Sequence, residues 1–212
     1  MGTAAPQSYR RYPLTRMLGD SGHVRLLRVL LSHGGALSST QLAAQAGLTP
    51  QGVRNVLEDL ELQGAVQVLG SGRTRLFRAR PEHPMTAAVA SLFTAERAQW
   101  ESFLTSLREA LAKQPDVVGG WLYGSVARGE DEPESDVDIA VLLESGRQPE
   151  HVRDEFSALE RQLNASFSII TLKRSELARI NLSWWRSLVA EALVLKGRRP
   201  EEELHAKKVG RV

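Results

Sequence analysis

The segment from Gly119 to Leu143, GGWLYGSVARGEDEPESDVDIAVLL, limits the possible folds more than any other part of the chain. It predicts a strand that ends in a turn at Gly124 and Ser125, then a helix start, an acidic loop and a second strand. Glycine permits such a sharp turn, and the backbone amides that follow it can point outwards at a phosphate. The segment therefore predicts two strands joined through a phosphate-binding turn.

Two aspartates, Asp136 and Asp138, open the second strand and alternate with Val137 and Ile139. Side chains of a strand point alternately to its two faces, so both carboxylates share one face while the apolar residues enter the core. Mg²⁺ (or Mn²⁺) is typically held by one or two carboxylates together with substrate phosphates. The pair predicts a divalent-cation site that faces the turn. The alternative is an ordinary exposed turn followed by two solvated aspartates.

The sequences GSVARG and SDVDI, in this order and at this separation, resemble the signature of the polymerase-beta-like nucleotidyltransferases, and most closely their short bacterial branch. The resemblance implies an Mg²⁺-dependent transfer of a nucleoside monophosphate from a nucleoside triphosphate to a hydroxyl acceptor. It also implies catalytic and metal-binding roles for Asp136 and Asp138. Phosphate binding is implied for Gly124, Ser125 and Arg128.

Active members of this family use a third carboxylate, on a strand expected to run antiparallel to the aspartate pair. Here that strand is SFSIITL, residues 166–172, and the family's pattern places Ser168 where the acid belongs. A serine hydroxyl is neutral and a poorer Mg²⁺ ligand than a carboxylate. Two functions stay open. Either the domain is an active enzyme in which another acid, such as Glu130 or Glu134, substitutes, or it is impaired and serves a DNA-binding transcriptional regulator as a nucleotide sensor or dimerisation body.

The first third of the chain reads as helix, short helix, helix and hairpin. The apolar spacing predicts helices at residues 23–32, 40–45 and 50–63, with Ser39 and Thr49 as caps of the second and third. Two strand-like runs then flank a glycine-rich tip at residues 70–73. This order resembles the winged helix-turn-helix of MarR-like and ArsR-like bacterial regulators over roughly residues 14–80.

That resemblance implies that Gln51, Arg54 and Asn55 on the third helix face the major groove of double-stranded DNA. Arg73 and Arg75 on the wing would then reach phosphates or the minor groove. Charge agrees with this, because residues 1–84 hold ten arginines against five acidic residues although the net charge of the whole chain is only +2. The alternative is a solvated helix face on a dimerisation or protein-docking module.

The fold class predicted for the whole chain is α+β. Residues 14–84 are expected to form the winged helix-turn-helix and 115–198 a nucleotidyltransferase-like domain with a small mixed sheet and flanking helices. Residues 85–114 are expected to form a linker helix, and 199–212 a frayed basic tail. The linker carries a broad apolar stripe that could pair two chains or dock the two domains. The resemblance to winged-helix regulators, which are commonly dimers, implies a homodimer, although intramolecular core is nearly as good an explanation of the stripe.

Two absences from the sequence complete the expectations. The chain has no cysteine, so it has no disulfide and no thiolate metal site. It also has no run of about eighteen apolar residues, so no membrane partner is expected, and the protein is expected to be cytoplasmic.

Overall fold

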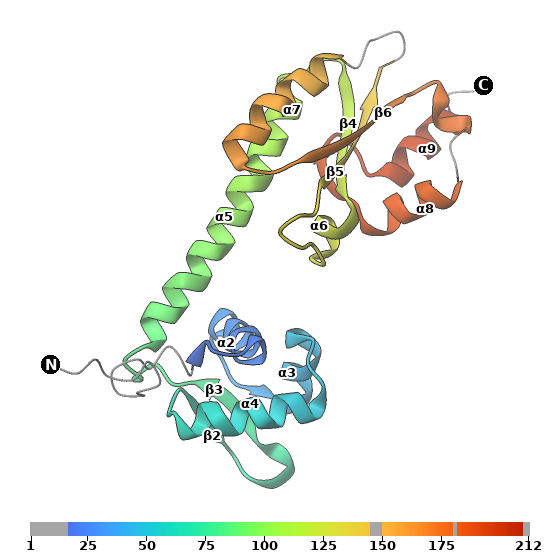
Figure 1. Ribbon diagram of the computed structural model, residues 1–212. Helices are drawn as coiled ribbons and strands as arrows, with labels where there is room; N and C mark the ends of the chain where they lie inside the picture. Colours follow the sequence, from blue (N-terminus) through green and yellow to red (C-terminus); the bar gives the residue numbers. More distant parts are fainter. Residues whose placement is uncertain (1–16, 145–149, 180–181, 210–212) are drawn as a thin grey trace, which may run out of the picture. The chain divides into compact units, whose positions relative to one another are not determined.

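The computed structural model of the protein describes residues 17–144, 150–179 and 182–209 (Figure 1). They form two compact units that divide between Ala98 and Gln99, within helix α5 (Thr86–Ala112). Each unit has its own hydrophobic core. Beyond Glu144, the turn expected at residues 144–149 lies outside the described residues.

The first unit combines three helices with a small antiparallel sheet, whose strands have the order β1-β3-β2. Helices α3 and α4 follow one another across a short turn, and the β2–β3 hairpin comes directly after α4 (Figure 1). This order of elements is the winged helix-turn-helix fold that the sequence predicts. Before α5, the described part of the chain contains α2 (Ser21–His33), β1 (Leu37–Ser38), α3 (Ser39–Ala46), α4 (Pro50–Leu62), β2 (Val66–Leu69), the 3₁₀ turn η1 (Gly72–Thr74) and β3 (Leu76–Ala79).

Local capping explains where the helices of the first unit begin. The Thr49 hydroxyl accepts a hydrogen bond from the Gly52 amide at 3.1 Å, and Pro50 takes the first helical position of α4, as predicted. For α3 the cap is Ser38 and not Ser39. Ser38 ends the short strand β1 in an extended conformation and forms a reciprocal capping box with Gln41, and this pair fixes the start of the helix one residue earlier.

Helix α4 presents one apolar stripe to the core of its unit. Val53, Val56, Leu57 and Leu60 are buried, and their spacing is the i, i+3, i+4, i+7 pattern read from the sequence. The stripe packs in a cluster with residues of α2 and with the first part of α5. The opposite face of α4 stays in solvent.

The second unit is built on a four-stranded mixed sheet with the order β6-β5-β4-β7. Strand β4 is antiparallel to both β5 and β7, whereas β5 and β6 are parallel. Its elements beyond α5 are β4 (Val117–Tyr123), α6 (Gly124–Arg128), β5 (Val137–Leu143), α7 (Glu150–Leu163), β6 (Phe167–Lys173), the 3₁₀ turn η2 (Glu176–Arg179), α8 (Leu182–Glu191), β7 (Leu193–Lys196) and α9 (Pro200–Val209).

Helices cover both faces of this sheet (Figure 1). One face, with Val137, Ile139 and Val141, packs in a cluster with Leu107 of α5 and Phe156 of α7. The other face packs against α8, and its cluster comprises the buried residues Trp121, Ala140, Leu142, Leu172, Leu177, Trp185 and Leu188. The two tryptophans of this set meet edge to face, with ring centroids 6.1 Å apart, so Trp185 is a core residue.

The expectation that the third strand runs antiparallel to the aspartate strand is wrong. Strands β5 and β6 are parallel because helix α7 lies between them in sequence and carries the chain back to the starting end of the sheet. A parallel pair requires such a crossover, whereas an antiparallel pair needs only a short turn.

The end of the chain also differs from the expectation. Helix α8 ends at Glu191, and the strand that follows, β7, pairs with β4. This pairing is set by tertiary contacts along β4 and not by a local pattern in the sequence. The expected frayed tail is instead largely helix α9. The Glu203 side chain, 3% exposed, accepts a hydrogen bond from Arg174 at 2.7 Å and attaches this helix to its unit.

Helix α5 (Thr86–Ala112) spans nearly the range of the linker helix expected at residues 85–114, but it contributes to the cores of both units. Val89 and Phe93 are buried in the core of the first unit, and Leu107 and Leu111 in that of the second. Much of the predicted stripe is therefore intramolecular core. Leu92 of the first unit is an exception, with 55% of its surface exposed.

Candidate functional site

Three polar side chains lie side by side across the sheet of the second unit. Tyr123 of β4 is the register partner of Asp138 of β5, and Asp138 is the register partner of Ser168 of β6. Directly opposed residues of neighbouring strands point to the same face, which here is the face that packs against α8. The register confirms that Ser168 lies beside the aspartate strand at Asp138. Ser168 also makes a side-chain hydrogen bond with the Asp138 carboxylate.

Gly124 brings the turn after β4 into direct contact with Asp138. Its φ is 76°, in the left-handed region, and a Cβ at this position would lie 2.2 Å from Asp138 Oδ2. Only glycine therefore fits between the strand end and the carboxylate. Ser125 follows as the second residue of the one-turn helix α6 and is half-buried, with its carbonyl accepting from the Glu130 amide at 2.9 Å.

Burial raises the pKa of the Asp138 carboxyl above its ordinary value. The hydrogen bond from Ser168 acts in the opposite direction, while the negative charges of Asp136 and Glu191 raise the pKa further. Asp136 itself is exposed, immediately before β5, while Val137 and Ile139 are buried on the opposite face. The predicted alternation of carboxylate and apolar residues is thus present. Tyr123 has a raised pKa as well, because it is partly buried and lies near Asp138.

Arg128, the last residue of α6, is held by two glutamates. Its Nε donates to Glu130 Oε2 at 2.8 Å, and its Nη1 donates to Glu191 Oε2. These hydrogen bonds raise the pKa of the guanidinium. Glu130, suggested from the sequence as a substitute third acid, is therefore engaged with Arg128. Glu134 is exposed in the loop before β5.

Glu191 is the acidic residue of this site that the sequence did not indicate. It ends helix α8, its side chain is 16% exposed, and its Oε1 accepts from the Gly124 amide at 3.4 Å. It lies 67 residues from Gly124 in the sequence, beyond the motif, and no spacing rule connects the two positions. Only the way α8 packs on the sheet brings it to the turn.

On the first unit, the three side chains predicted to read DNA form one hydrogen-bonded row on the exposed face of α4. Arg54 Nη2 donates to Gln51 Oε1 at 2.8 Å, and Gln51 Nε2 donates to Asn55 Oδ1 at 2.7 Å. All three residues are exposed. The sequence therefore placed them together correctly, at the N-terminal half of the second helix of the helix-turn-helix.

The wing is more constrained than the sequence suggested. Arg75 stacks over the Phe77 ring, with its guanidinium carbon 5.4 Å from the ring centroid, and its Nη2 lies 3.5 Å from Glu61 Oε2. Arg75 is thus already paired. Arg73 belongs to the short 3₁₀ turn Gly72–Thr74 at the wing tip, and its side chain lies outside what the structure describes.

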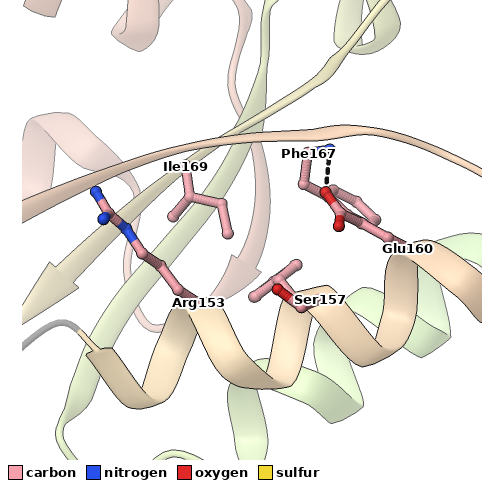
Figure 2. Close-up of a pocket in the computed structure, with 6 residues that line it drawn as sticks. Arg153, Ser157, Glu160, Phe167 and Ile169 are labelled. Carbon is pink, nitrogen blue, oxygen red and sulfur yellow. Dashed lines mark hydrogen bonds between the residues drawn. The ribbon is translucent and has the colours of Figure 1, made fainter.

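A groove of about 320 Å³ opens between α7 and β6 (Figure 2). It does not belong to the acidic site, because Phe167 and Ile169 point to the opposite face of β6 from Ser168. At one end, Glu160 Oε1 accepts from the Phe167 amide at 3.1 Å. The groove is lined by Arg153, Phe156, Ser157, Glu160, Phe167 and Ile169.

Two further observations concern what the described part of the chain can hold. Within residues 17–144, 150–179 and 182–209, no three acidic, histidine or cysteine side chains converge closely enough to bind a metal by themselves. A cation at Asp136 and Asp138 would thus need ligands from a substrate. No helix in the same ranges is long and apolar enough to cross a membrane.

Residues 105–183 match the model of the family described as Polymerase beta, Nucleotidyltransferase. This part of the chain is therefore a nucleotidyltransferase-family domain, as the motif resemblance implied. The match contains Gly124, Ser125, Arg128 and both aspartates. Together with the first unit, it makes the protein a winged helix-turn-helix fused to a nucleotidyltransferase fold.

Solved structures similar to this chain include two transcriptional regulators and a toxin-antitoxin. The AntR antimony-specific transcriptional repressor is 26% identical over 44% of this chain and 81% of its own, with a TM-score of 0.38. A toxin-antitoxin with AMP-PNP is 21% identical over 50% and 82%, with a TM-score of 0.38. The MarR family transcriptional regulator SPO1453 from Silicibacter pomeroyi DSS-3 is 20% identical over 47% and 71%, with a TM-score of 0.38. No curated protein matches the chain.

Proposed function

We propose that the protein binds double-stranded DNA through its winged helix and a nucleoside triphosphate with Mg²⁺ through its nucleotidyltransferase-family domain. One observation carries the second half of the proposal. The turn at Gly124 lies against the Asp138 carboxylate so closely that no Cβ fits between them. A phosphate bound by the amides of this turn and by Arg128 would therefore lie beside the carboxylate that holds its cation.

The residues present suit a magnesium ion that is shared with a substrate. Asp136, Asp138 and the Ser168 hydroxyl offer only oxygen ligands, which Mg²⁺ prefers. When bound, the cation would neutralise phosphate charge and polarise the phosphoryl oxygens. Gly124, Ser125 and Arg128 would orient the triphosphate. This assignment of roles follows the family signature, residue by residue.

Nucleotide sensing by a DNA-binding regulator is the form of this function that the geometry favours. Ser168 is the register partner of Asp138. This supports the assignment of Ser168, a neutral hydroxyl, to the position of the family's third carboxylate. With only the carboxylates of Asp136 and Asp138, the site suits reversible binding of a metal–nucleotide complex better than nucleotidyl transfer. In-line transfer would lack a third carboxylate to hold the cation and a base to deprotonate the acceptor hydroxyl.

Transfer of a nucleoside monophosphate to a hydroxyl acceptor is the second candidate function. It is favoured by the family match, which spans the glycine turn and both aspartates. We tie the two candidates to a single change, Ser168→Asp, which would place a third carboxylate beside the pair. If the wild type is a sensor, this variant should gain Mg²⁺ affinity and basal transfer. If the wild type already transfers nucleotides at a rate that the variant does not exceed, the sensor form is wrong.

The DNA half of the proposal rests on the exposed row of Gln51, Arg54 and Asn55 on α4. Such a row suits base edges in the major groove, and the arginine-rich first unit supplies phosphate contacts. We expect a homodimer, because winged-helix proteins of this kind read two half-sites with two recognition helices. Sedimentation of the full chain with and without DNA tests the dimer.

Calorimetric titration of the full chain with nucleoside triphosphates in the presence of Mg²⁺ tests nucleotide binding directly. The wild type should release or absorb heat on binding, and Asp136→Ala with Asp138→Ala should abolish the signal. Incubation with labelled nucleotides, with and without DNA, then separates sensing from transfer. Absence of heat for every nucleotide at high protein concentration would contradict the proposed binding.

A further inference from the structure

The Glu191 carboxylate occupies the two hydrogen-bond donors that a phosphate would need. Its Oε1 accepts from the Gly124 amide at 3.4 Å, and its Oε2 accepts from Arg128 Nη1. A backbone amide at a glycine turn together with a guanidinium is a donor pair typical of phosphate recognition. An internal anion therefore accepts hydrogen bonds from groups that could hold an external one.

The position of Asp138 leaves little room for a phosphate to bind beside Glu191. A Cβ on Gly124 would meet Asp138 Oδ2, so this carboxylate contacts the glycine, while Glu191 is hydrogen-bonded to its amide. A phosphate oxygen that accepts from the same N–H must take the position of Glu191 Oε1. The Asp138 and Glu191 carboxylates would also repel a triphosphate that binds at the Gly124 amide.

We propose that Glu191 is a built-in competitor of the nucleotide, so that a triphosphate binds only after this side chain has left Gly124 and Arg128. The inference rests on the proposed nucleotide binding and adds its regulation. Glu191 is suited to such a movement because it ends α8, and a single residue separates it from the start of β7 at Leu193. Rotation of its side chain does not require either element to unfold.

The opposite role makes the opposite prediction. If Glu191 served to orient Arg128 for the nucleotide, its removal would weaken binding. If Glu191 competes, its removal strengthens binding, because no internal contact has to be broken first. The sign of the change in affinity thus decides between support and competition.

The experiment compares Mg²⁺–ATP binding to the full-length wild type and to Glu191→Gln, which keeps the shape and removes the charge. Calorimetry should show a dissociation constant lowered by about threefold to tenfold, the range expected for loss of one partly exposed charge pair and one charge-assisted hydrogen bond. Glu191→Asp keeps the charge but is shorter by one methylene, and it should give a smaller gain in the same direction.

Two controls separate displacement from a general change in field. Glu202→Gln removes the same charge from an exposed position of α9 and should leave affinity within twofold of the wild type. Glu130→Gln removes the other partner of Arg128 but leaves the Gly124 amide bonded to Glu191. The Glu191→Gln gain should exceed that of Glu130→Gln and persist at about 0.5 M salt, where field effects between exposed charges are largely screened.

Each outcome decides one question. A gain for Glu191→Gln that persists in salt supports the competitor, and so does binding by the variant when the wild type shows none. Equal or weaker binding by Glu191→Gln and Glu191→Asp, with clear binding by the wild type, overturns the competitor and leaves the proposed function intact. No binding by any of these proteins overturns the proposed nucleotide binding, and the competitor with it.

Discussion

The glycine at the end of β4 cannot be replaced without loss of stability. Gly124→Ala would place a non-glycine residue at φ 76° with its Cβ against Asp138 Oδ2. We expect a loss of about 2 kcal/mol or more in the free energy of unfolding, because left-handed strain and a clash combine. Urea unfolding followed by tryptophan fluorescence measures it.

Gly129→Ala is the matched control for that variant. Gly129 has φ 68°, so it carries the same backbone strain, but nothing lies within 4 Å of its Cβ position. We expect a loss of about 1 kcal/mol from strain alone. Equal losses for the two variants would show that Asp138 yields to the new methyl group and that the turn is not closely packed.

Asp138 should lower the stability of the protein at neutral pH. Its folded-state pKa is raised by burial above the unfolded value, so the native state binds the proton more tightly in that range. Stability is therefore lost as pH rises above the ordinary aspartate pKa and through the folded one. Asp138→Asn should raise the melting temperature at pH 7.5 relative to the wild type, with a smaller difference at pH 3.5. Asp131→Asn, in the exposed loop, should show no such pH-dependent gain, and an equal gain there would contradict the assignment to burial.

Sequence alone identified most of this site because the motif residues are close together in the chain. Gly124, Arg128 and the aspartates lie within one strand–turn–strand segment, where alternation and glycine chemistry fix their geometry. Ser168 was found through the family's pattern, and its register beside Asp138 is confirmed. Glu191 was not found, because its place depends on how a distant helix packs.

At the level of elements, helix α4 offers the sharpest test of the proposed DNA binding. Arg54→Ala removes the guanidinium at one end of the exposed row and should weaken binding to a specific site by about 1–3 kcal/mol, with a smaller effect on unrelated DNA. Fluorescence anisotropy with labelled duplexes measures both affinities. Arg97→Ala, on the exposed surface of α5 in the same unit, is the control with the same loss of charge.

Substitution of an arginine on the wing should affect DNA binding differently from substitution of Arg54 on α4. Arg75 already pairs with Glu61 and stacks on Phe77, so its removal also alters the packing of the hairpin. We expect Arg75→Ala to weaken binding to all sequences alike and to reduce the salt dependence. A loss of sequence preference for Arg75→Ala and none for Arg54→Ala would reverse the roles assigned to helix and wing.

Elements defined by local pattern were predictable, and those defined by tertiary pairing were not. The apolar stripe of α4 lies within its thirteen residues, the cap Thr49 directly precedes them, and the helix appears as expected. Strand β7 has four residues and exists because β4 offers it a free edge. Helix α9 has little apolar content, and its attachment depends on the pair formed by Glu203 and Arg174.

For the whole molecule, the two cores predict two separable unfolding transitions. All four tryptophans, at positions 100, 121, 184 and 185, belong to the second unit, so tryptophan fluorescence follows that unit alone. Circular dichroism follows the helices of both. If the proposed function is right, Mg²⁺–ATP should raise the midpoint temperature of the transition seen by fluorescence, which is that of the second unit. A DNA duplex should raise the midpoint temperature of the first unit, which is seen by circular dichroism. A single transition that both ligands shift equally would show that the two units unfold as one.

The free edge of the sheet in the second unit bears on how the protein behaves when concentrated. Strand β6 lies at one edge of the sheet. The Ser166 carbonyl accepts a hydrogen bond from the Val137 amide, and the Arg174 amide donates to the Leu143 carbonyl, so even-numbered residues of β6 pair with β5. The amides of the odd-numbered residues, from Phe167 to Lys173, therefore face away from the sheet. Glu160 accepts from the Phe167 amide, and Glu176 from the Lys173 amide at 3.0 Å. Both ends of the edge are therefore closed to an incoming strand.

We expect these two carboxylates to limit aggregation, because an unpaired strand edge can form hydrogen bonds with a strand of another molecule. Glu160→Val would free the Phe167 amide next to the groove between α7 and β6, and light scattering should then rise with time and concentration. Asp154→Val, the same kind of change at an exposed position of α7, should scatter like the wild type. A side chain outside both proposed binding sites would thus set the concentration at which the purified protein stays clear.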